Sequence, residues 1–477
     1  RPRAGSWERG AGRAARAAGR GVRQGTPSPV PEACQSGSAG AAFRLWGGAL
    51  RRAPVLSLPG AATAVTPVTR DQALASSQRL KIETPELQGS INLTGAQLDD
   101  LHLTQYRETI DPKSPTIVLL SPAGTPNAFF AEQGFVGATG TVARLPDSKT
   151  VWQAPADAVL SVGKPVTLTW DNGAGLIFTR QISIDDHFVF SVTQAVQNNS
   201  AAPVALIPYA RVQRQDTPVI AGWWVFFEGM LGVLGDKLQE INYSDVQGAK
   251  EPTRIDSQGG WLGFTDKYWA AALIPDQKEP FRAMYSGVKA RDVTEKDAFQ
   301  TDYLRGAVII PPSARKGVEG HLYAGAKQAT LIDGYEAKLG IAQFDRMIDW
   351  GWFYFLTKPM FYLLDFLNGL VGNFGIAILI ATLLVKAVVF PLANKSYASM
   401  SKMKKLQPEM LKLKELYPDD KMKQQQGMME LYKKEKVSPI SGCLPVVVQI
   451  PVFFSLYKVI LTSIELRHAP FFGWVHD

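Results

Sequence analysis

The sequence predicts a mixed protein, in which a large antiparallel β-sandwich precedes an α-helical membrane region with a cytoplasmic helical hairpin. Three observations lead to this prediction. Short alternating apolar runs separated by turn residues fill most of the chain up to residue 338. Two longer apolar runs, Phe374–Leu392 and Gly442–Ile464, can each cross a bilayer core of about 30 Å as a helix. A basic polar stretch, Ala393–Pro439, lies between them.

The composition fits a globular domain joined to a membrane region. The 477 residues carry a net charge of +8, and 46% of them are hydrophobic. The basic excess is confined to the first 52 residues and to residues 393–439, which argues against a nucleic-acid surface, so no DNA partner is expected. Cys34 and Cys443 lie in unrelated contexts and indicate neither a disulfide framework nor a metal site. In the absence of an HExxH, GxSxG or P-loop motif, we expect no enzyme activity and no cofactor.

Residues 1–77 are predicted to be disordered or extraneous. Ten Arg occur up to Arg52 among Gly, Ala, Ser and Pro, with little hydrophobic periodicity. A transit peptide is the alternative, because such peptides are rich in Arg and poor in acidic residues. The most apolar stretch, Ala53–Val68, contains three prolines and is too short to span a membrane.

Residues 78–338 are predicted to form the β-sandwich. Runs such as Val166–Trp170, Leu176–Ile184 and Phe188–Val196 alternate between apolar and polar residues, and Asn172-Gly173 separates the first two. Period-2 alternation with Asn-Gly turns is typical of antiparallel hairpins. Some 260 residues of this pattern suffice for a large sandwich.

The histidines of this region, His102, His187 and His321, are scattered along the chain. We expect each of them to be a hydrogen-bonded or surface residue rather than part of a catalytic or metal site.

Residues 339–370 are expected to form an amphipathic helix on the outer membrane surface. The stretch is crowded with aromatic residues, which favour the headgroup region, and its charges, such as Asp349 and Asp365, make it a poor spanning helix. Lys358-Pro359 is expected to break or bend the helix. A third spanning helix is the alternative.

The charge of the connecting stretch predicts the orientation of the two spans. Residues 393–439 contain 11 Lys, no Arg and 6 acidic residues, a net charge of +5, and short basic loops stay cytoplasmic. The first span, residues 371–393, therefore runs inward, and the second, residues 440–464, returns. Residues 465–477 leave the membrane on the outer side, where Phe471, Phe472 and Trp474 suit the interface.

Polar residues of both spans fall at one depth in the inner leaflet. At about 1.5 Å per residue, Lys386 lies roughly 9 Å and Gln449 roughly 10 Å from the cytoplasmic end of its span. Thr382 lies four residues before Lys386 and shares its helical face. Two interpretations remain open. Either Lys386 snorkels to the headgroups while Gln449 makes one interhelical hydrogen bond, or a water-filled groove carries a positive charge inside the membrane.

The cytoplasmic stretch, residues 394–439, is expected to be a helical hairpin that turns at Pro418-Asp419. Its two arms carry apolar residues near helical spacing and contain six of the ten methionines. Flexible thioethers suit promiscuous contacts, although these residues could equally form the seam of the hairpin. The lysines would face anionic headgroups or RNA. The residues that we select as candidate contacts are Met400, Met403, Lys404, Lys405, Met428, Met429, Lys433 and Lys434.

Three stretches of the sequence closely resemble the YidC/Oxa/Alb family of bacterial membrane protein insertases, in its Gram-negative form. They are LVKAVVFPLANKSYASMSKMKKLQPEM, MMELYKKEKVSPISGCLPVVVQIPVFFSLYKV and IELRHAPFFGWVHD. The resemblance runs without a gap from about Phe344 to Asp477. The family normally has Arg where this chain has Lys386, so the positive charge is kept but the bidentate fork is not. Because the family adds an amino-terminal anchor and further spans, the chain is expected to be truncated at both ends.

The resemblance implies a multi-pass protein of the bacterial inner membrane, whose periplasmic β-sandwich is similar to mutarotase-like folds. It implies an insertase and chaperone that acts alone or with the secretion translocon through a hydrophilic intramembrane groove, here Lys386, Thr382 and Gln449. The hairpin would contact clients or the ribosome. The implied partners are nascent inner-membrane proteins, the lipid bilayer, the ribosome and the translocon. A transporter or channel subunit and a membrane-tethered carbohydrate-binding sandwich are the alternatives.

Overall fold

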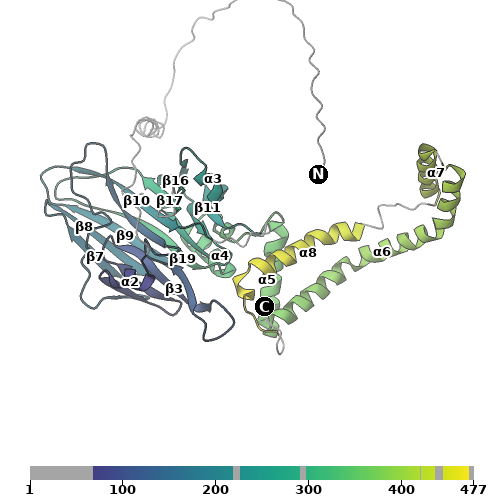
Figure 1. Cartoon of the computed structure of the whole chain (residues 1–477), viewed down its shortest axis with the longest axis horizontal. Coiled ribbons are helices and arrows are strands. Elements are labelled where there is room, and N and C mark those ends of the chain that lie inside the picture. Colours follow the sequence, from purple (N-terminus) through teal and green to yellow (C-terminus); the bar gives the residue numbers. More distant parts are fainter. Residues whose placement is uncertain (1–67, 219–225, 290–296, 419, 436–443, 472–477) are drawn as a thin grey trace, which may run out of the picture. The chain divides into compact units, whose positions relative to one another are not determined.

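The computed structural model describes residues 68–218, 226–289, 297–418, 420–435 and 444–471 (Figure 1). The expectations for residues 1–67, for Cys443, and for Phe472 and Trp474 concern residues outside this description.

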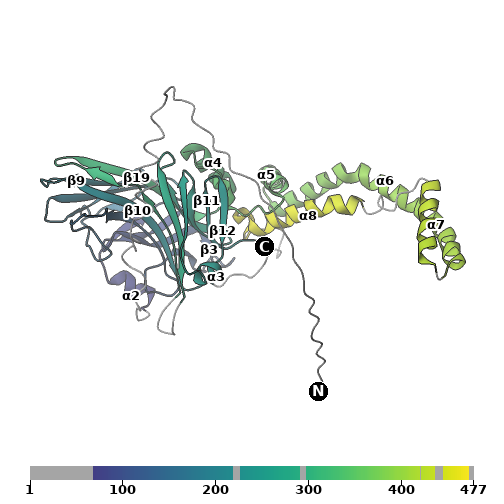
Figure 2. The same cartoon turned by 90° about the horizontal axis from the view of Figure 1, so that it is seen from above.

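Two β-sheets form the first part of the described chain (Figures 1 and 2). The strands of the first sheet follow the order β13-β16-β17-β10-β5-β3-β2-β1-β6, with β18 on β10 and β4 on β3, and those of the second follow β12-β11-β14-β15-β19-β9-β8-β7. The strands are β1 (Arg79–Glu83), β2 (Leu87–Asn92), β3 (Gln97–Arg107), β4 (Thr116–Leu120), β5 (Phe129–Gly137), β6 (Val159–Leu160), β7 (Val166–Asp171), β8 (Leu176–Ile184), β9 (Val189–Asn198), β10 (Val204–Gln215), β11 (Gly229–Leu234), β12 (Lys237–Ile241), β13 (Thr253–Gln258), β14 (Trp261–Thr265), β15 (Trp269–Pro275), β16 (Pro280–Val288), β17 (Ala298–Arg305), β18 (Val308–Ile310) and β19 (Arg315–Ala326).

The fold class predicted from the sequence is confirmed. Among the described strands, every pairing is antiparallel except that of β1 with β6. The β7–β8 hairpin turns at Asn172 and Gly173, where the Asn172 side chain accepts the Leu176 amide and Gly173 adopts a φ of +72°. The two sheets pack face to face, because Phe129 of β5 and Phe264 of β14 are in edge contact at 5.6 Å.

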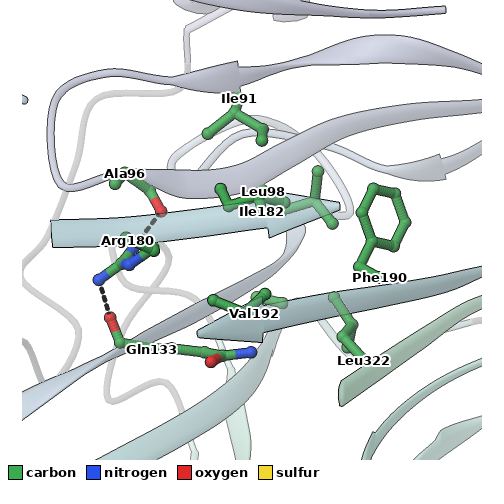
Figure 3. Close-up of a pocket in the computed structure, with 10 residues that line it drawn as sticks. Ile91, Ala96, Leu98, Gln133, Arg180, Ile182, Phe190, Val192 and Leu322 are labelled. Atoms are coloured by element: carbon green, nitrogen blue, oxygen red, sulfur yellow. Dashed lines mark hydrogen bonds between the residues drawn. The ribbon is translucent and has the colours of Figure 1, made fainter. Parts of the chain in front are cut away.

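A buried cation lies between the two sheets. Arg180 of β8 donates hydrogen bonds to the backbone carbonyls of Ala96 and Gln133 (Figure 3), and its guanidinium lies 4.9 Å from the centroid of the Trp152 ring. It borders a mainly apolar pocket whose empty space is about 360 Å³, open solvent included. Burial lowers the pKa of Arg180 to about 10, so the group remains charged at neutral pH. Carbonyl and ring contacts thus hold a positive charge inside the core.

Each of the three histidines has a hydrogen-bonding neighbour, as expected. His102 contacts Arg70 at 2.9 Å, His187 contacts Glu86 at 2.8 Å, and His321 contacts Ser191 at 2.9 Å. Within the described residues, no group of three or more His, Cys, Asp or Glu could hold a metal ion.

The prediction that residues 1–77 are disordered is wrong at the carboxyl end of that range. Residues 70–75 form the short helix α2 (Arg70–Ala75), which begins with a capping box between Thr69 and Gln72. Arg70 reaches from this helix to an ion pair with Asp100 of β3. Local capping and this long-range pair order ten residues that the Arg-rich composition had grouped with the leader.

Helices follow the sandwich in the chain. The remaining helical elements are α3 (Tyr243–Gln247), α4 (Ala329–Leu339), η1 (Phe344–Met347), α5 (Tyr354–Val371), α6 (Phe374–Leu416), α7 (Lys421–Lys434), α8 (Leu444–Thr462) and η3 (Ile464–Leu466).

Helix α5 is not broken at Pro359, contrary to expectation. Pro359 is the sixth residue of the helix, so only the carbonyl of Phe355 loses its amide partner. A proline near a helix start is therefore tolerated here.

Helix α6 joins two elements that the sequence predicted to be separate. It runs through Pro391 into the first arm of the hairpin and contains 43 residues. At about 1.5 Å per residue its length is about 65 Å, roughly twice a bilayer core of about 30 Å. The stretch between Pro391 and Pro418 contains no Gly, and the helix continues through its one proline, Pro408.

Candidate functional site

The candidate site lies where α5, α6 and α8 meet. Helix α6 begins at the cap residue Asn373, whose side chain accepts the Ile376 amide at 3.1 Å. Of the described helices, α6 is the one long and apolar enough to cross a membrane, and the apolar stretch of α8, Val446–Thr462, is shorter. Helix α5 contacts both α6 and α8, and it contacts each of them more extensively than they contact each other.

A pocket lies between these three helices. Its empty space is about 320 Å³, open solvent included. The lining residues are Met360 of α5, Ala381, Thr382, Val385 and Lys386 of α6, and Gln449, Val452, Phe453 and Leu456 of α8. The three groove residues selected from the sequence, Lys386, Thr382 and Gln449, therefore come together in one pocket.

The charge of Lys386 is exposed at this pocket. Its ammonium lies 5.4 Å from the centroid of the Phe453 ring, and it forms no ion pair with any residue that the structure describes. Thr382 and Gln449 are half-buried and add a hydroxyl and an amide. The arrangement offers one positive charge and two neutral hydrogen-bonding groups on an apolar background. Such a surface can hold a polar or acidic segment.

The structure divides the hairpin methionines between a seam and the surface. Helix α7 packs on the carboxyl-terminal part of α6, where the Tyr432 hydroxyl lies 3.6 Å from the sulfur of Met410 and Gly427 packs against Leu413. Met403 and Met428 are half-buried, whereas Met400 and Met429 are exposed. The candidate lysines are all exposed, namely Lys404, Lys405, Lys433 and Lys434.

An ionic network fixes helix α5. Lys358 donates to Asp345 of η1 at 2.7 Å and to Asp333 of α4 at 3.1 Å, while Tyr354 and Tyr362 donate to the same two carboxylates. Burial opposes the charged form of Lys358, but the hydrogen bonds to Asp345 and Asp333 outweigh it and raise its pKa. The network ties α5 to the helices that close the sandwich domain.

A second polar connection joins α8 to the segment before α5. Lys458 is paired with Asp349 at 2.8 Å, with side chains that are 3% and 23% exposed. The same carboxylate accepts the Phe227 amide at 2.8 Å and the Gly351 amide at 2.9 Å. Lys458 is the single charge of the apolar run Gly442–Ile464. Its partner could not be predicted, because no spacing rule relates residues so far apart in the chain.

A third connection lies just beyond α8. Glu465 accepts the amide of Ala329, the first residue of α4, at 2.8 Å, and so caps that helix from a distant part of the chain. Burial raises the pKa of Glu465 to about 7, although the Ala329 amide opposes the shift. Sequence reasoning also missed this contact.

Comparison with solved structures gives distant similarities. A galactose mutarotase-like protein from Lactobacillus casei aligns along its whole length with 52% of this chain, at 10% identity and a TM-score of 0.33. A putative aldose 1-epimerase from Escherichia coli aligns with 52% of the chain, at 9% identity and a TM-score of 0.35.

Comparison with known sequences is far more specific. Proteins described as membrane protein insertase YidC are 52% identical over 420 residues in Nitrobacter hamburgensis and 53% identical over 423 residues in Beijerinckia indica. The alignments cover 86% and 88% of this chain and 68% and 69% of the relatives.

Two family descriptions account for nearly all of the described chain. The YidC periplasmic domain family matches residues 79–363, which contain the sandwich and most of α5. The 60Kd inner membrane protein family matches residues 366–477, which contain α6, α7 and α8. The two matches meet within α5, the helix that contacts both the sandwich side and the pocket. The chain belongs to the YidC family of membrane protein insertases.

Proposed function

We propose that this protein inserts inner-membrane proteins, and that the pocket of Lys386, Thr382 and Gln449 is part of a hydrophilic groove that receives the polar tail of a client. The observation that carries the proposal is the meeting of these side chains from two apolar helices in one open pocket. The family membership and the names of the relatives favour this function over a channel subunit or a carbohydrate-binding module.

The groove would act by lowering the cost of moving polar groups through hydrocarbon. An unsatisfied backbone group costs several kcal/mol in lipid, and the pocket offers hydrogen-bonding partners in its place. The apolar part of the client would slide along the exposed sides of α6 and α8, where residues such as Leu383, Val388 and Ile450 are 58–81% exposed. Burial of the client segment in lipid, at about 25 cal/mol per Å² of apolar surface, would drive completion.

We place the carboxyl-terminal part of α6 and all of α7 in the cytoplasm and the sandwich in the periplasm, with α6 and α8 both crossing the inner membrane. The net charge of +5 between the two apolar runs supports this topology. The exposed side chains of Trp352, Phe355 and Phe366 support a position of α5 at the outer interface. Labelling of a cysteine at the exposed position Ser401 by an impermeant thiol reagent in intact spheroplasts would contradict the assignment.

Crosslinking tests the groove directly. In a variant without Cys34 and Cys443, a cysteine at Thr382 or Gln449 is expected to crosslink to the polar tail of a client that has been stalled during insertion into membrane vesicles. A cysteine at Leu379 is the control, because that residue lies on α6 and is 61% exposed but does not line the pocket. Equal crosslinking at all three positions, or none at the two pocket positions, would contradict a groove.

We further propose that the hairpin contacts clients or the ribosome, and that the secretion translocon is a partner in some insertions. A variant with six Gln substitutions tests this contact. It is expected to capture clients or ribosomes about tenfold less well, because apolar and charged contacts are both lost. The substituted residues are all exposed, namely Met400, Met429, Lys404, Lys405, Lys433 and Lys434. Co-sedimentation of ribosome-bound clients with vesicles measures this. The matched control replaces the seam residue Met410 by Leu, which preserves volume. If the surface set behaves like the control, the hairpin is only a spacer.

A further inference from the structure

One lining residue of the Lys386 pocket comes from neither of the two apolar runs. Met360 belongs to α5, is 6% exposed, and is the contribution of that helix to the lining. The aliphatic residues of the lining include Ala381 of α6 and Leu456 of α8. The pocket thus has a polar end at Lys386 and Gln449 and, at Ala381 and Leu456, an end that is apolar except for Thr382.

The direction of the helices gives the position of this apolar end. Along α6, Ala381 precedes Lys386 by five residues, and along α8, Leu456 follows Gln449 by seven. At about 1.5 Å per residue these offsets are about 8 and 10 Å toward the same side, the outer side in the proposed topology. Helix α5 meets α8 at this end, because the hydroxyl of Thr357 donates to Ser455, the residue before Leu456. Met360 follows Thr357 by about one turn, which places it on the side of the pocket away from the cytoplasm.

Close packing lets α5 reach this position. Ala377 and Ala381 are 0% and 1% exposed and present small side chains on α6. On α8, Ser455 is 0% exposed and accepts a 3.4 Å hydrogen bond from the hydroxyl of Thr357, which is also fully buried. These small residues allow α5 to approach both helices, and the ionic network of Lys358, two residues before Met360, holds α5 against α4 and η1.

We propose that Met360 is the floor of the insertion groove, and that it limits how far the polar tail of a client can enter. The inference rests on the proposed function of the pocket and adds a residue that determines its depth. An unbranched thioether suits this position, because it fills an irregular gap. The Lys358 network positions the floor, so one of the connections between the sandwich domain and the groove runs through α5.

The first test uses crosslinking to the stalled polar tail of a client in the variant without Cys34 and Cys443. Cysteines at Thr382, Gln449 and Met360 are expected to crosslink, whereas a cysteine at Leu364 is not. Leu364 is the matched control, because it lies one turn further along α5 and is fully buried but does not line the pocket. Crosslinking at Thr382 and Gln449 without crosslinking at Met360 would overturn the proposal that Met360 is the floor, but not the proposal of a groove. No crosslinking at any of the three would overturn the groove and the floor with it.

The second test fills the floor. Met360→Trp is expected to lower the crosslinking yield at Thr382 about tenfold, the size of effect that overpacking a filled site produces. Phe366→Trp introduces the same side chain into the same helix at a position that is 65% exposed and does not line the pocket, and the yield at Thr382 is expected to stay within about twofold of the parent. Equal losses in the two tryptophan variants would show that packing of α5, and not the pocket floor, is responsible, and would overturn the proposal.

Discussion

Replacing Lys386 by Glu is expected to slow the insertion of clients with acidic translocated tails much more than that of clients with neutral tails. The change converts attraction to repulsion at the pocket. At an effective dielectric constant of about 20, two unit charges about 4 Å apart interact by about 4 kcal/mol. Even one third of that energy corresponds to about a tenfold difference in rate. Insertion rates of matched clients into proteoliposomes, differing only in the charge of the tail, measure the effect.

A second charge reversal serves as the control for Lys386. Lys395→Glu changes the net charge equally, in the same helix, at an exposed position that does not line the pocket. It is expected to affect acidic and neutral clients alike. Lys386→Arg keeps the positive charge and should keep the preference for acidic tails. If Lys386→Glu leaves acidic clients unaffected, Lys386 only snorkels to the headgroups, which is the alternative that the sequence left open.

Replacing Asp349 by Asn is expected to destabilise the connection between α8 and the sandwich domain. The amide keeps the shape of the side chain but removes the carboxylate partner of Lys458, a residue whose side chain is 3% exposed. Removing one partner of a buried ion pair costs about 3–5 kcal/mol, and the partial exposure of Asp349 favours the lower end. Thermal unfolding in detergent, followed by limited proteolysis between the two regions, measures the loss.

A double-mutant cycle separates this ion pair from the other roles of Asp349. Asp349 also accepts the amides of Phe227 and Gly351, so part of the loss belongs to those hydrogen bonds. Lys458→Met removes the cation and keeps the stem of the side chain. If the pair matters, the double variant Lys458→Met with Asp349→Asn is less destabilised than the sum of the single variants. Strict additivity would mean that the pair contributes no coupling.

The local pattern of the sequence determined the strands and the candidate residues of the pocket. Period-2 alternation with an Asn-Gly turn located β8 at Leu176–Ile184 with both ends correct, because one buried face favours apolar residues at alternate positions, with Arg180 as the exception. Helical rise alone predicted that Lys386 and Gln449 lie at one level, because a regular helix converts residue number into distance, and both residues line one pocket. Family-specific motifs around Lys386 indicated the function without any knowledge of the geometry.

Only the tertiary structure showed that α5 contributes to the pocket and how α8 is attached to the sandwich domain. The partners of Lys458 and Glu465 are Asp349 and Ala329, more than 100 residues away in sequence, and no periodicity relates such residues. The sequence predicted only that Met360 belongs to an interfacial helix. Its position in the pocket depends on the small, buried side chains of Ala377 and Ala381, which allow α5 to pack closely against α6. Periodicity determines which face of a helix is apolar, but the shapes of the facing side chains determine what that face packs against.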